Sequence, residues 1–358
     1  MGVFQAIGSD THEEVLFGSD PVSGLRTIIA IHSTALGPAL GGTRFFAYRN
    51  EEEALTDVLR LSTGMTYKSA AAGLDLGGGK AVIIGDPATL RSERLFRAYG
   101  EIVESLGGRY ITAEDVGTTT ADMAMVSRQT KWVAGLPEEL GGSGDPSPAT
   151  ARGVLTAIRA VASHLWGSDD LTDRTVAVQG VGKVGSNLVE RLTKAGASTV
   201  IADVDGTALD RVATRSGSRI AALDDIYDVE CDIFAPCALG ASLNETTIPR
   251  LRCAAVVGSA NNQLATDPDA DRLAERGITY APDFVVNAGG IINIAVGIAG
   301  YESRRAANAI DRINDAVIEV LERAAADGTN THQAAVLMAE ERIDRIGSLR
   351  RHRPIPGS

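Results

Sequence analysis

The chain has 358 residues, of which 44% are apolar and 22% charged, and this is enough for two domains with separate hydrophobic cores. Its formal net charge of -12 and isoelectric point near 5.0 argue against nucleic acid as a partner, because phosphate binding requires basic surface. The three cysteines, five scattered histidines and lack of a long apolar run favour a cytoplasmic protein with reduced thiols. We expect no metal site, no signal peptide and no membrane span.

Alternating apolar residues predict strands at residues 14–17 and 25–32, which a turn containing proline and glycine joins into a β-hairpin. The next segment contains a pair of glycines, Gly41 and Gly42, where another group can approach the backbone closely. Residues 51–65 then repeat apolar side chains with the helical period, which predicts an amphipathic helix with an asparagine as its N-cap.

Two lysines, Lys68 and Lys80, belong to the most informative stretch of the chain. Three glycines precede Lys80 and an apolar run follows it, so we expect this lysine where a glycine loop enters a buried strand. The chain uses arginine for most of its 34 basic residues, and arginine cannot lose its proton, so a lysine in this setting suggests proton transfer. A buried amine loses hydration, which favours the neutral form that a general base needs. The alternative is a surface lysine beside a turn.

An acidic residue follows the next predicted strand. Residues 89–106 are predicted to form a helix that two glycines end, and residues 110–113 a short strand. Asp115 comes shortly after this strand and before a loop of small residues, so its carboxylate is well placed to project into a cleft. Alternatively, Asp115 only caps the helix that starts near Thr119.

A break rich in glycine, serine and proline at residues 141–148 predicts an interdomain linker and hinge. The predicted fold class is therefore α/β with two domains and an active site in the cleft between them. Residues 1–147 would form a substrate domain with a mixed sheet, and residues 148–330 a Rossmann-type domain. The C-terminal helix, residues 331–358, is expected to pack back on the first domain.

A glycine-rich turn after the apolar strand at residues 175–179 has the full context of a dinucleotide-binding site. Gly180, Gly182 and Gly185 open a helix, and the following strand ends at Asp203. The glycines permit a tight turn and the close approach of a pyrophosphate to the helix N-terminus. Asp203 would accept hydrogen bonds from ribose hydroxyls and repel a 2′-phosphate, which favours NAD over NADP. The alternative is an ordinary glycine-rich turn between a strand and a helix.

The strand–helix pattern continues to the end of the chain. Strands are predicted at residues 232–234, 255–257 and 278–280, and long helices at residues 302–326 and 331–349. The loops after these strands should line the cofactor site, because ligands bind at the carboxyl ends of parallel strands. In the loop at residues 283–290, Asn287 is the best polar candidate.

These motifs together resemble the glutamate/leucine/phenylalanine/valine dehydrogenase family over nearly the whole chain, and most closely its leucine and valine dehydrogenases. The matching segments are residues 37–44, 74–87, 113–117, 231–240, 258–264 and 286–290. The resemblance implies a homo-oligomeric enzyme with NAD as its cofactor. Such an enzyme converts an L-amino acid and water reversibly into the 2-oxo acid and ammonium.

The resemblance also implies roles for individual residues. Lys68 would hold the substrate carboxylate, helped by the backbone of Gly41 and Gly42. Lys80 would activate water against the imino carbon, and Asp115 would carry a proton to and from the nitrogen. Other matched positions would contact substrate or cofactor: Asn262, Asn287, Thr150, Gly180, Gly182, Lys183, Val184, Gly185, Asp203, Cys237, Ala238, Ala260 and Asn261.

The side chains of the predicted substrate pocket are aliphatic: Leu40, Met65, Ala113, Ile291 and Ile294. Glutamate-specific members have a lysine in place of Leu40 and a serine in place of Ile294, so glutamate is disfavoured, because its second carboxylate would be buried unpaired. We expect overlapping activity on leucine, isoleucine and valine, with leucine dehydrogenase preferred and valine dehydrogenase as the alternative. The isoleucines, which are larger than the usual valines of leucine dehydrogenases, favour that alternative. Phenylalanine should be a poorer substrate.

The chain departs from the resemblance at two places. Ala134 stands where many relatives have threonine, and Val296 and Gly297 stand where relatives often have Asp-Glu. A glycine there would weaken the start of a helix. A catalytically silent NAD-binding regulator on the same scaffold is a further alternative, because a fold does not determine a function.

Overall fold

The computed structural model describes residues 12–298 and 300–349, and these divide into two compact units. Within them, the first unit comprises residues 12–145, 294–302 and 339–349, and the second unit residues 146–293 and 303–338. Residues 294–302 therefore group with the first unit, although the sequence suggested the Rossmann-type domain. Gly297 accounts for part of this difference, because it lies against Ser143, a residue of the predicted linker that also belongs to the first unit.

The first unit is built on a five-stranded mixed sheet with the strand order β1–β2–β4–β3–β5. Its strands are β1 (Glu14–Asp20), β2 (Leu25–Ser33), β3 (Ala39–Phe46), β4 (Gly77–Ile84) and β5 (Tyr110–Glu114). β1 and β2 form the predicted antiparallel hairpin, and β2 is also antiparallel to β4. β3 runs parallel to both β4 and β5, so the predicted mixed sheet is confirmed.

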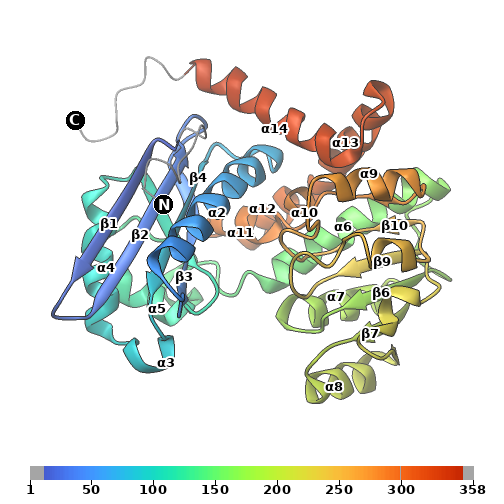
Figure 1. Ribbon diagram of the computed structural model, residues 1–358, viewed down its shortest axis with the longest axis horizontal. Coiled ribbons are helices and arrows are strands. Elements are labelled where there is room, and N and C mark those ends of the chain that lie inside the picture. Colours follow the sequence, from blue (N-terminus) through green and yellow to red (C-terminus); the bar gives the residue numbers. More distant parts are fainter. Residues whose placement is uncertain (1–11, 299, 350–358) are drawn as a thin grey trace. The chain divides into compact units, whose positions relative to one another are not determined.

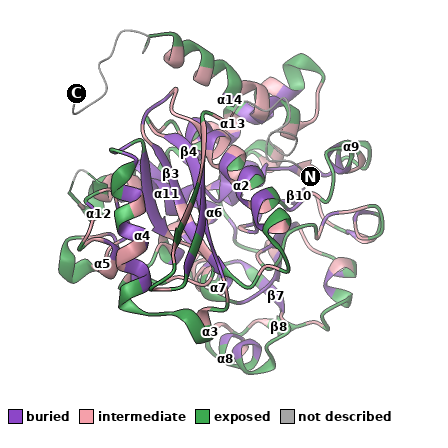
Figure 2. Cartoon of the chain, turned by 60° about the vertical axis from the view of Figure 1, so that its left-hand side comes forward, coloured by how far each residue is buried: buried purple, intermediate pink, exposed green. Residues whose placement is uncertain are grey.

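Helices cover both faces of this sheet (Figure 1). They are α2 (Glu51–Ala71), α3 (Pro87–Leu90), α4 (Glu93–Ser105) and α5 (Thr120–Val126), and a 3-10 turn, η1, follows at Glu138–Leu140. Side chains of a strand alternate between the faces, so Ile28 and Ala30 of β2 pack with α2, whereas Ile29 and Ile31 pack with α4. Figure 2 shows the result: β4 is buried along its whole length, while α3 has no buried residue.

Helix α2 is longer than predicted. It continues beyond Met65 to Ala71 and therefore carries Lys68 in its last turn. Its predicted N-cap is confirmed, because the Asn50 side chain accepts a hydrogen bond from the Glu53 N–H at 2.8 Å.

The three glycines before Lys80 lie inside strand β4 and not in a loop as predicted. A Cβ on Gly78 would lie 2.1 Å from the backbone nitrogen of Thr66, so this glycine lets α2 lie directly on the strand. On the other face, a Cβ on Gly79 would lie 2.8 Å from the ring of Tyr110. The glycines therefore continue the strand through a place where neighbouring groups occupy the space of side chains.

The predicted single helix at residues 89–106 is wrong, because the chain turns between α3 and α4. Ser92 is the N-cap of α4, and its hydroxyl accepts a hydrogen bond from the Leu95 N–H at 3.3 Å. The positive φ angles of Gly107 and Gly108, 59° and 85°, confirm the predicted end of the second piece.

The second unit contains a six-stranded parallel sheet with the strand order β11–β10–β9–β6–β7–β8. The strands are β6 (Thr175–Gln179), β7 (Ser198–Ala202), β8 (Arg219–Ile220), β9 (Ile233–Pro236), β10 (Ala255–Val256) and β11 (Thr279–Tyr280). The chain adds β7 and β8 on one side of β6 and then β9, β10 and β11 on the other. The strand order therefore reverses between β6 and β9, which is where ligands bind in doubly wound sheets.

The remaining helices lie along the chain between residues 147 and 347. They are α6 (Ser147–Trp166), α7 (Lys183–Lys194), α8 (Gly206–Ser216), α9 (Pro268–Glu275), α10 (Asp283–Val286), α11 (Gly289–Ile298), α12 (Ser303–Asp311), α13 (Ile313–Asp327) and α14 (Thr331–Gly347). Short 3-10 turns occur at η2 (Asp225–Asp228) and η3 (Ile248–Arg250). In the part of the chain that the structure describes, no helix is long and apolar enough to cross a bilayer.

Two helix predictions need correction in this region. The expected helix at residues 302–326 is split into α12 and α13 at Arg312. Residues 283–290, predicted as a loop, form α10 and the first turn of α11. A Cβ on Gly289 would lie 2.3 Å from the Ala149 carbonyl oxygen, so the glycines at this helix start allow close packing on α6. Gly297 belongs to the last turn of α11 and not to the start of a helix.

Candidate active site

Lys80 and Asp115 lie side by side in the first unit, with 2.7 Å between Lys80 Nζ and Asp115 Oδ2. Lys80 comes from β4 and Asp115 from the turn after β5, and β3 separates these strands in the sheet. Only 6% of Lys80 is exposed, so the interpretation as a surface lysine is wrong. The helix after Asp115 is capped by Thr119 in a capping box, so Asp115 is not its cap.

The electrostatic surroundings of Asp115 keep its carboxylate ionised. Burial raises the pKa of Asp115, but the charges of Lys80 and then of Arg44 outweigh this and lower the pKa to about 2. A buried amine and an ionised carboxylate in contact can exchange protons with a bound reactant, which is the chemistry of a general acid and base.

Lys68 lies on the same side of the first sheet as Lys80. Lys80 has the parity of Val82, which packs against α2, and Lys68 belongs to the last turn of that helix. Lys68 and Met65, one turn earlier, are half-buried. The roles predicted for them in substrate binding stay predictions.

The glycine pair in β3 is required by the sheet itself. A Cβ on Gly41 would lie 1.7 Å from the Gly79 carbonyl oxygen, and one on Gly42 would lie 2.5 Å from the Glu114 carbonyl oxygen. The groups that approach these glycines are therefore β4 and the end of β5. The predicted contact of Gly41 and Gly42 with a substrate carboxylate stays a prediction.

The three glycines after β6 have three different environments. Gly180 has a φ angle of 98°, which glycine adopts readily, and a Cβ on Gly185 would lie 2.0 Å from the Gly180 carbonyl oxygen. A Cβ on Gly182, in contrast, would meet nothing within 4 Å. The first and third glycines are thus needed for the turn and for close packing of α7, whereas the second leaves open space in front of the helix N-terminus. An anionic ligand such as a pyrophosphate fits this arrangement.

Asp203 is directly connected to this loop. Its Oδ2 accepts a hydrogen bond from the Val181 N–H at 2.6 Å, and its Oδ1 accepts one from the Asp205 N–H at 2.8 Å. Lys183 is exposed and Val184 is half-buried in the first turn of α7. Asp203 therefore stabilises the glycine loop through a hydrogen bond, in addition to its predicted role at the ribose.

The loop after β9 lies against the glycine loop. A Cβ on Gly180 would lie 2.8 Å from the Ala238 backbone nitrogen, and one on Gly185 would lie 3.4 Å from Cys237 Cβ. The structure therefore brings these predicted cofactor residues together at the reversal of strand order. Burial raises the pKa of the Cys237 thiol, which favours its neutral form.

Asn287 is a buried amide with one unsatisfied atom. It is 6% exposed, and its Nδ2 donates to Asn261 Oδ1 at 2.9 Å and weakly to the Ala260 carbonyl oxygen at 3.5 Å. Among the described residues, no donor reaches Asn287 Oδ1. A ligand hydroxyl or amine could satisfy it. Asn262 is exposed with a φ angle of 52°, and the Thr150 hydroxyl donates to the Pro146 carbonyl oxygen at 3.0 Å.

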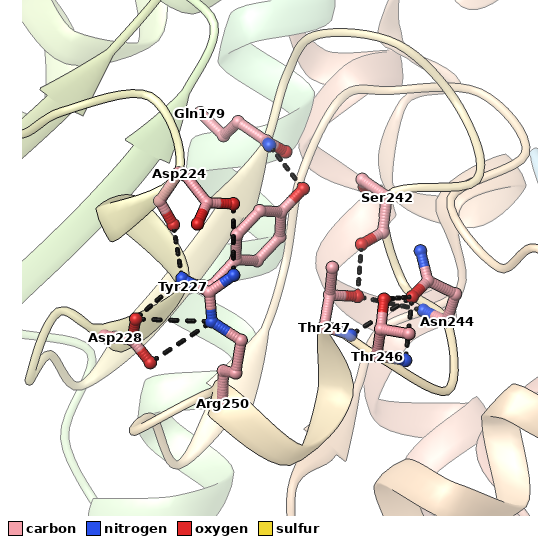
Figure 3. A network of polar contacts seen from close by, with 9 residues as sticks. All are labelled: Gln179, Asp224, Tyr227, Asp228, Ser242, Asn244, Thr246, Thr247 and Arg250. Carbon is pink, nitrogen blue, oxygen red and sulfur yellow. Dashed lines mark hydrogen bonds and ion pairs between the residues drawn. The ribbon is translucent and has the colours of Figure 1, made fainter.

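The sequence analysis did not predict the polar network that begins at the carboxyl end of β6 (Figure 3). Gln179, the last residue of β6, donates through Nε2 to the Tyr227 hydroxyl at 2.7 Å, and Arg250 lies over the Tyr227 ring. Arg250 also pairs with Asp228 at 2.7 Å. In the loop after β9, the Asn244 side chain accepts hydrogen bonds from the Thr246 and Thr247 N–H groups. The Asn-Glu-Thr-Thr turn was a visible signal for this loop, but the pairing of Gln179 with Tyr227 was not.

The residues predicted to form an aliphatic pocket are buried. Exposure is 1% for Leu40, 3% for Ala113, 7% for Ile291 and 8% for Ile294, and Ala134 is also buried, at 5%. Their contact with a substrate side chain stays a prediction.

Comparison with known proteins gives two matches to family models. Residues 12–132 match "Glu/Leu/Phe/Val dehydrogenase, dimerisation domain", and residues 141–213 and 201–350 match "Glutamate/Leucine/Phenylalanine/Valine dehydrogenase". The chain belongs to the glutamate/leucine/phenylalanine/valine dehydrogenase family. It is an amino acid dehydrogenase with NAD as its cofactor.

Individual relatives cover almost the full length of this dehydrogenase. A leucine dehydrogenase of Geobacillus stearothermophilus is 50% identical over 98% of this chain and 95% of its own. A valine dehydrogenase of Streptomyces coelicolor is also 50% identical, over 93% of this chain and 92% of its own. Among solved structures, L-tryptophan dehydrogenase from Nostoc punctiforme superposes with a TM-score of 0.83 at 41% identity, covering 96% of this chain and 99% of that one.

Replacement of Asp203 should change the cofactor preference of the dehydrogenase. Asp203→Asn keeps an acceptor for one of the two N–H groups, those of Val181 and Asp205, and removes the charge that would repel a 2′-phosphate. We expect the NAD:NADP ratio of kcat/KM to fall by about tenfold or more. Asp203→Ala should in addition weaken binding of both cofactors, because the Val181 N–H loses its acceptor. An unchanged ratio in both variants would show that the ribose is recognised by other residues.

Proposed function

We propose that this dehydrogenase catalyses the reversible oxidative deamination of branched-chain aliphatic L-amino acids, with leucine preferred. The reaction converts the amino acid, NAD and water into the 2-oxo acid, ammonium, NADH and a proton. The observation that carries the proposal is 50% identity to a leucine dehydrogenase over 98% of the chain, combined with the Lys80–Asp115 pair.

The residues of the first unit would supply the acid–base chemistry. Lys68 would bind the substrate carboxylate as a compact cation. Lys80 would take a proton from the water that adds to the imino carbon, and the ionised carboxylate of Asp115 would carry protons to and from the substrate nitrogen.

The residues of the second unit would hold NAD, which accepts a hydride from the substrate Cα when it is bound. The open space at Gly182 and the N-terminus of α7 suit its pyrophosphate, and Asp203 suits its adenosine ribose. The unsatisfied Oδ1 of Asn287 would accept a hydrogen bond from the ligand. Holding the reactants in a fixed orientation lowers the barrier by several kcal/mol.

Valine is the second candidate as preferred substrate, and two observations favour it. The valine dehydrogenase relative has the same identity to this chain as the leucine dehydrogenase, 50%, over a somewhat smaller share of it, 93% against 98%. The isoleucines at positions 291 and 294 are buried and larger than valine, so they would narrow an aliphatic pocket. A methylene group in such a pocket changes the preference by only about 1–3 kcal/mol.

We further propose a homo-oligomer in the cytoplasm that acts on small molecules. The match of residues 12–132 to a dimerisation domain supports the oligomer. The three cysteines, Cys231, Cys237 and Cys253, are free, as is usual in a reducing compartment.

A substrate panel tests the proposed function. NADH formation at alkaline pH should show higher kcat/KM for leucine, valine and isoleucine than for phenylalanine, tryptophan and glutamate, by about tenfold or more. The leucine-to-valine ratio decides between the two candidates. Tight NADH binding without turnover of any amino acid would instead support a silent NAD-binding regulator.

A further inference from the structure

The Lys80–Asp115 pair does not stand alone, because a second cation approaches the same carboxylate oxygen. Arg44 Nε lies 3.5 Å from Asp115 Oδ2, the atom that Lys80 Nζ approaches at 2.7 Å. Arg44 belongs to β3, the strand that lies between those of Lys80 and Asp115. One carboxylate in this part of the chain is therefore shared by two positive charges.

Arg44 is itself fixed from the opposite side. Its Nη1 lies 2.8 Å from Asp57 Oδ2 on helix α2, and the Tyr48 hydroxyl donates to the same Asp57 oxygen at 2.6 Å. About a quarter of the Arg44 side chain and a fifth of the Asp57 side chain are exposed, so the pair is partly shielded from water. The series of contacts Tyr48–Asp57–Arg44–Asp115–Lys80 thus connects helix α2 to the acid–base pair.

The geometry around Nε shows that this contact is electrostatic and not a saturated hydrogen bond. Arg44 Nε is buried, and among the described residues it donates no hydrogen bond. Asp115 Oδ2 lies 3.5 Å from this nitrogen. A buried donor without an acceptor is costly, so Arg44 is suited to pull the carboxylate towards itself whenever the grip of Lys80 weakens.

We infer that Arg44, held by Asp57 and Tyr48, is a positioning residue that orients Asp115 and supplies it with a second counter-charge. The inference rests on the proposed function. When Lys80 gives up its proton, Asp115 would otherwise lose its only cationic partner and move or take up the proton itself. With Arg44 present, the carboxylate keeps a cation throughout the cycle. The positive charge of Arg44 also opposes protonation of the pair as a whole.

The inference gives opposite expectations for the two ends of the network. In Arg44→Gln, loss of the cation should move the acidic limb of the kcat/KM profile to higher pH by about one unit, because the pair then binds its proton more tightly. In Asp57→Asn, Arg44 loses its own counter-charge and acts more strongly on Asp115, so the limb should move to lower pH. A purely structural role predicts lower thermal stability but no shift of opposite sign.

The experiment compares these variants with wild type on the best amino acid of the substrate panel. For Arg44→Gln we expect kcat to fall by about tenfold to a hundredfold while KM for the amino acid and the Kd for NADH change little, because the carboxylate is misplaced but the binding groups remain. Arg44→Lys should restore the acidic limb through its charge, and only part of kcat. Arg97→Gln is the matched control, since Arg97 is another half-buried arginine of the first unit with an acidic partner, Glu93.

Each outcome gives a decision. If the wild type is active and Arg44→Gln keeps the same pH profile and the same kcat, the inference is overturned and the proposed function stays intact. If Arg44→Gln does not fold, Asp57→Asn and Arg44→Lys decide: a limb that rises in Asp57→Asn, or that fails to return in Arg44→Lys, overturns it. A wild type that turns over no amino acid overturns both the inference and the function on which it rests.

Discussion

Replacement of Lys80 by alanine is expected to lower kcat by about a thousandfold or more while the Kd for NADH changes by less than about twofold. General base catalysis contributes on the order of 10²–10⁴ in rate, and the buried ammonium is also the closest counter-ion of Asp115. The residues that suit NAD belong to the second unit, whereas Lys80 belongs to the first. Stopped-flow turnover and NADH fluorescence titration would measure the two quantities separately.

Two further variants show whether the loss of turnover comes from the loss of a base or from the loss of a positive charge. Lys80→Arg keeps a positive charge beside Asp115 but cannot act as a base, so it should be nearly as inactive as the alanine variant. Lys194→Ala removes an exposed lysine that pairs with Glu190, and it should behave like wild type. Substantial turnover in Lys80→Arg would show that Lys80 acts through its charge alone.

The second large effect concerns the glycine loop after β6, where matched alanine substitutions should separate binding from folding. Gly182→Ala places its methyl group in open space, so the melting temperature should stay within about 2 °C of wild type. The same methyl group occupies the space that suits a pyrophosphate, and we expect NADH binding to weaken by about tenfold to a hundredfold.

Gly185→Ala should lose both thermal stability and affinity for NADH. Its Cβ would lie 2.0 Å from the Gly180 carbonyl oxygen, so α7 cannot keep its position against the loop. We expect the melting temperature to fall by about 5 °C or more in addition to the loss of NADH binding. Wild-type affinity for NADH in Gly182→Ala would show that the phosphates bind elsewhere.

The sequence was sufficient for the features that depend on local chemistry. The glycine spacing at residues 180–185 and the acid at the end of the next strand predicted a dinucleotide site, and the structure gives each glycine a distinct physical reason. The burial of Lys80 in a strand and the place of Asp115 just after another strand were predicted, although β3 lies between the two strands and their contact was not visible in the sequence. The mixed sheet and the parallel sheet were predictable because hairpins and strand–helix repeats have strong local patterns.

The features that were missed depend on contacts between distant parts of the chain. Arg44 and Asp57 are thirteen positions apart on different elements, and nothing local connects them. The helix breaks at Ser92 and Arg312 lack the glycine or proline that usually marks such a turn. Conversely, Gly289 begins a helix although glycine disfavours helices, because the packing of α11 on α6 leaves no room for a side chain.

The direction in which the Lys80 side chain points depends more on the number of residues in strand β4 than on their identity. Gly78, Lys80 and Val82 share one side of the sheet because successive residues alternate, and Gly79 and Ala81 face the other side. Loss or gain of one residue before Lys80 would turn the amine towards the aromatic core around α4 and leave Asp115 without it. This segment can therefore accept exchanges of suitable residues during evolution, but its residue count is constrained by a simple rule of odd and even positions.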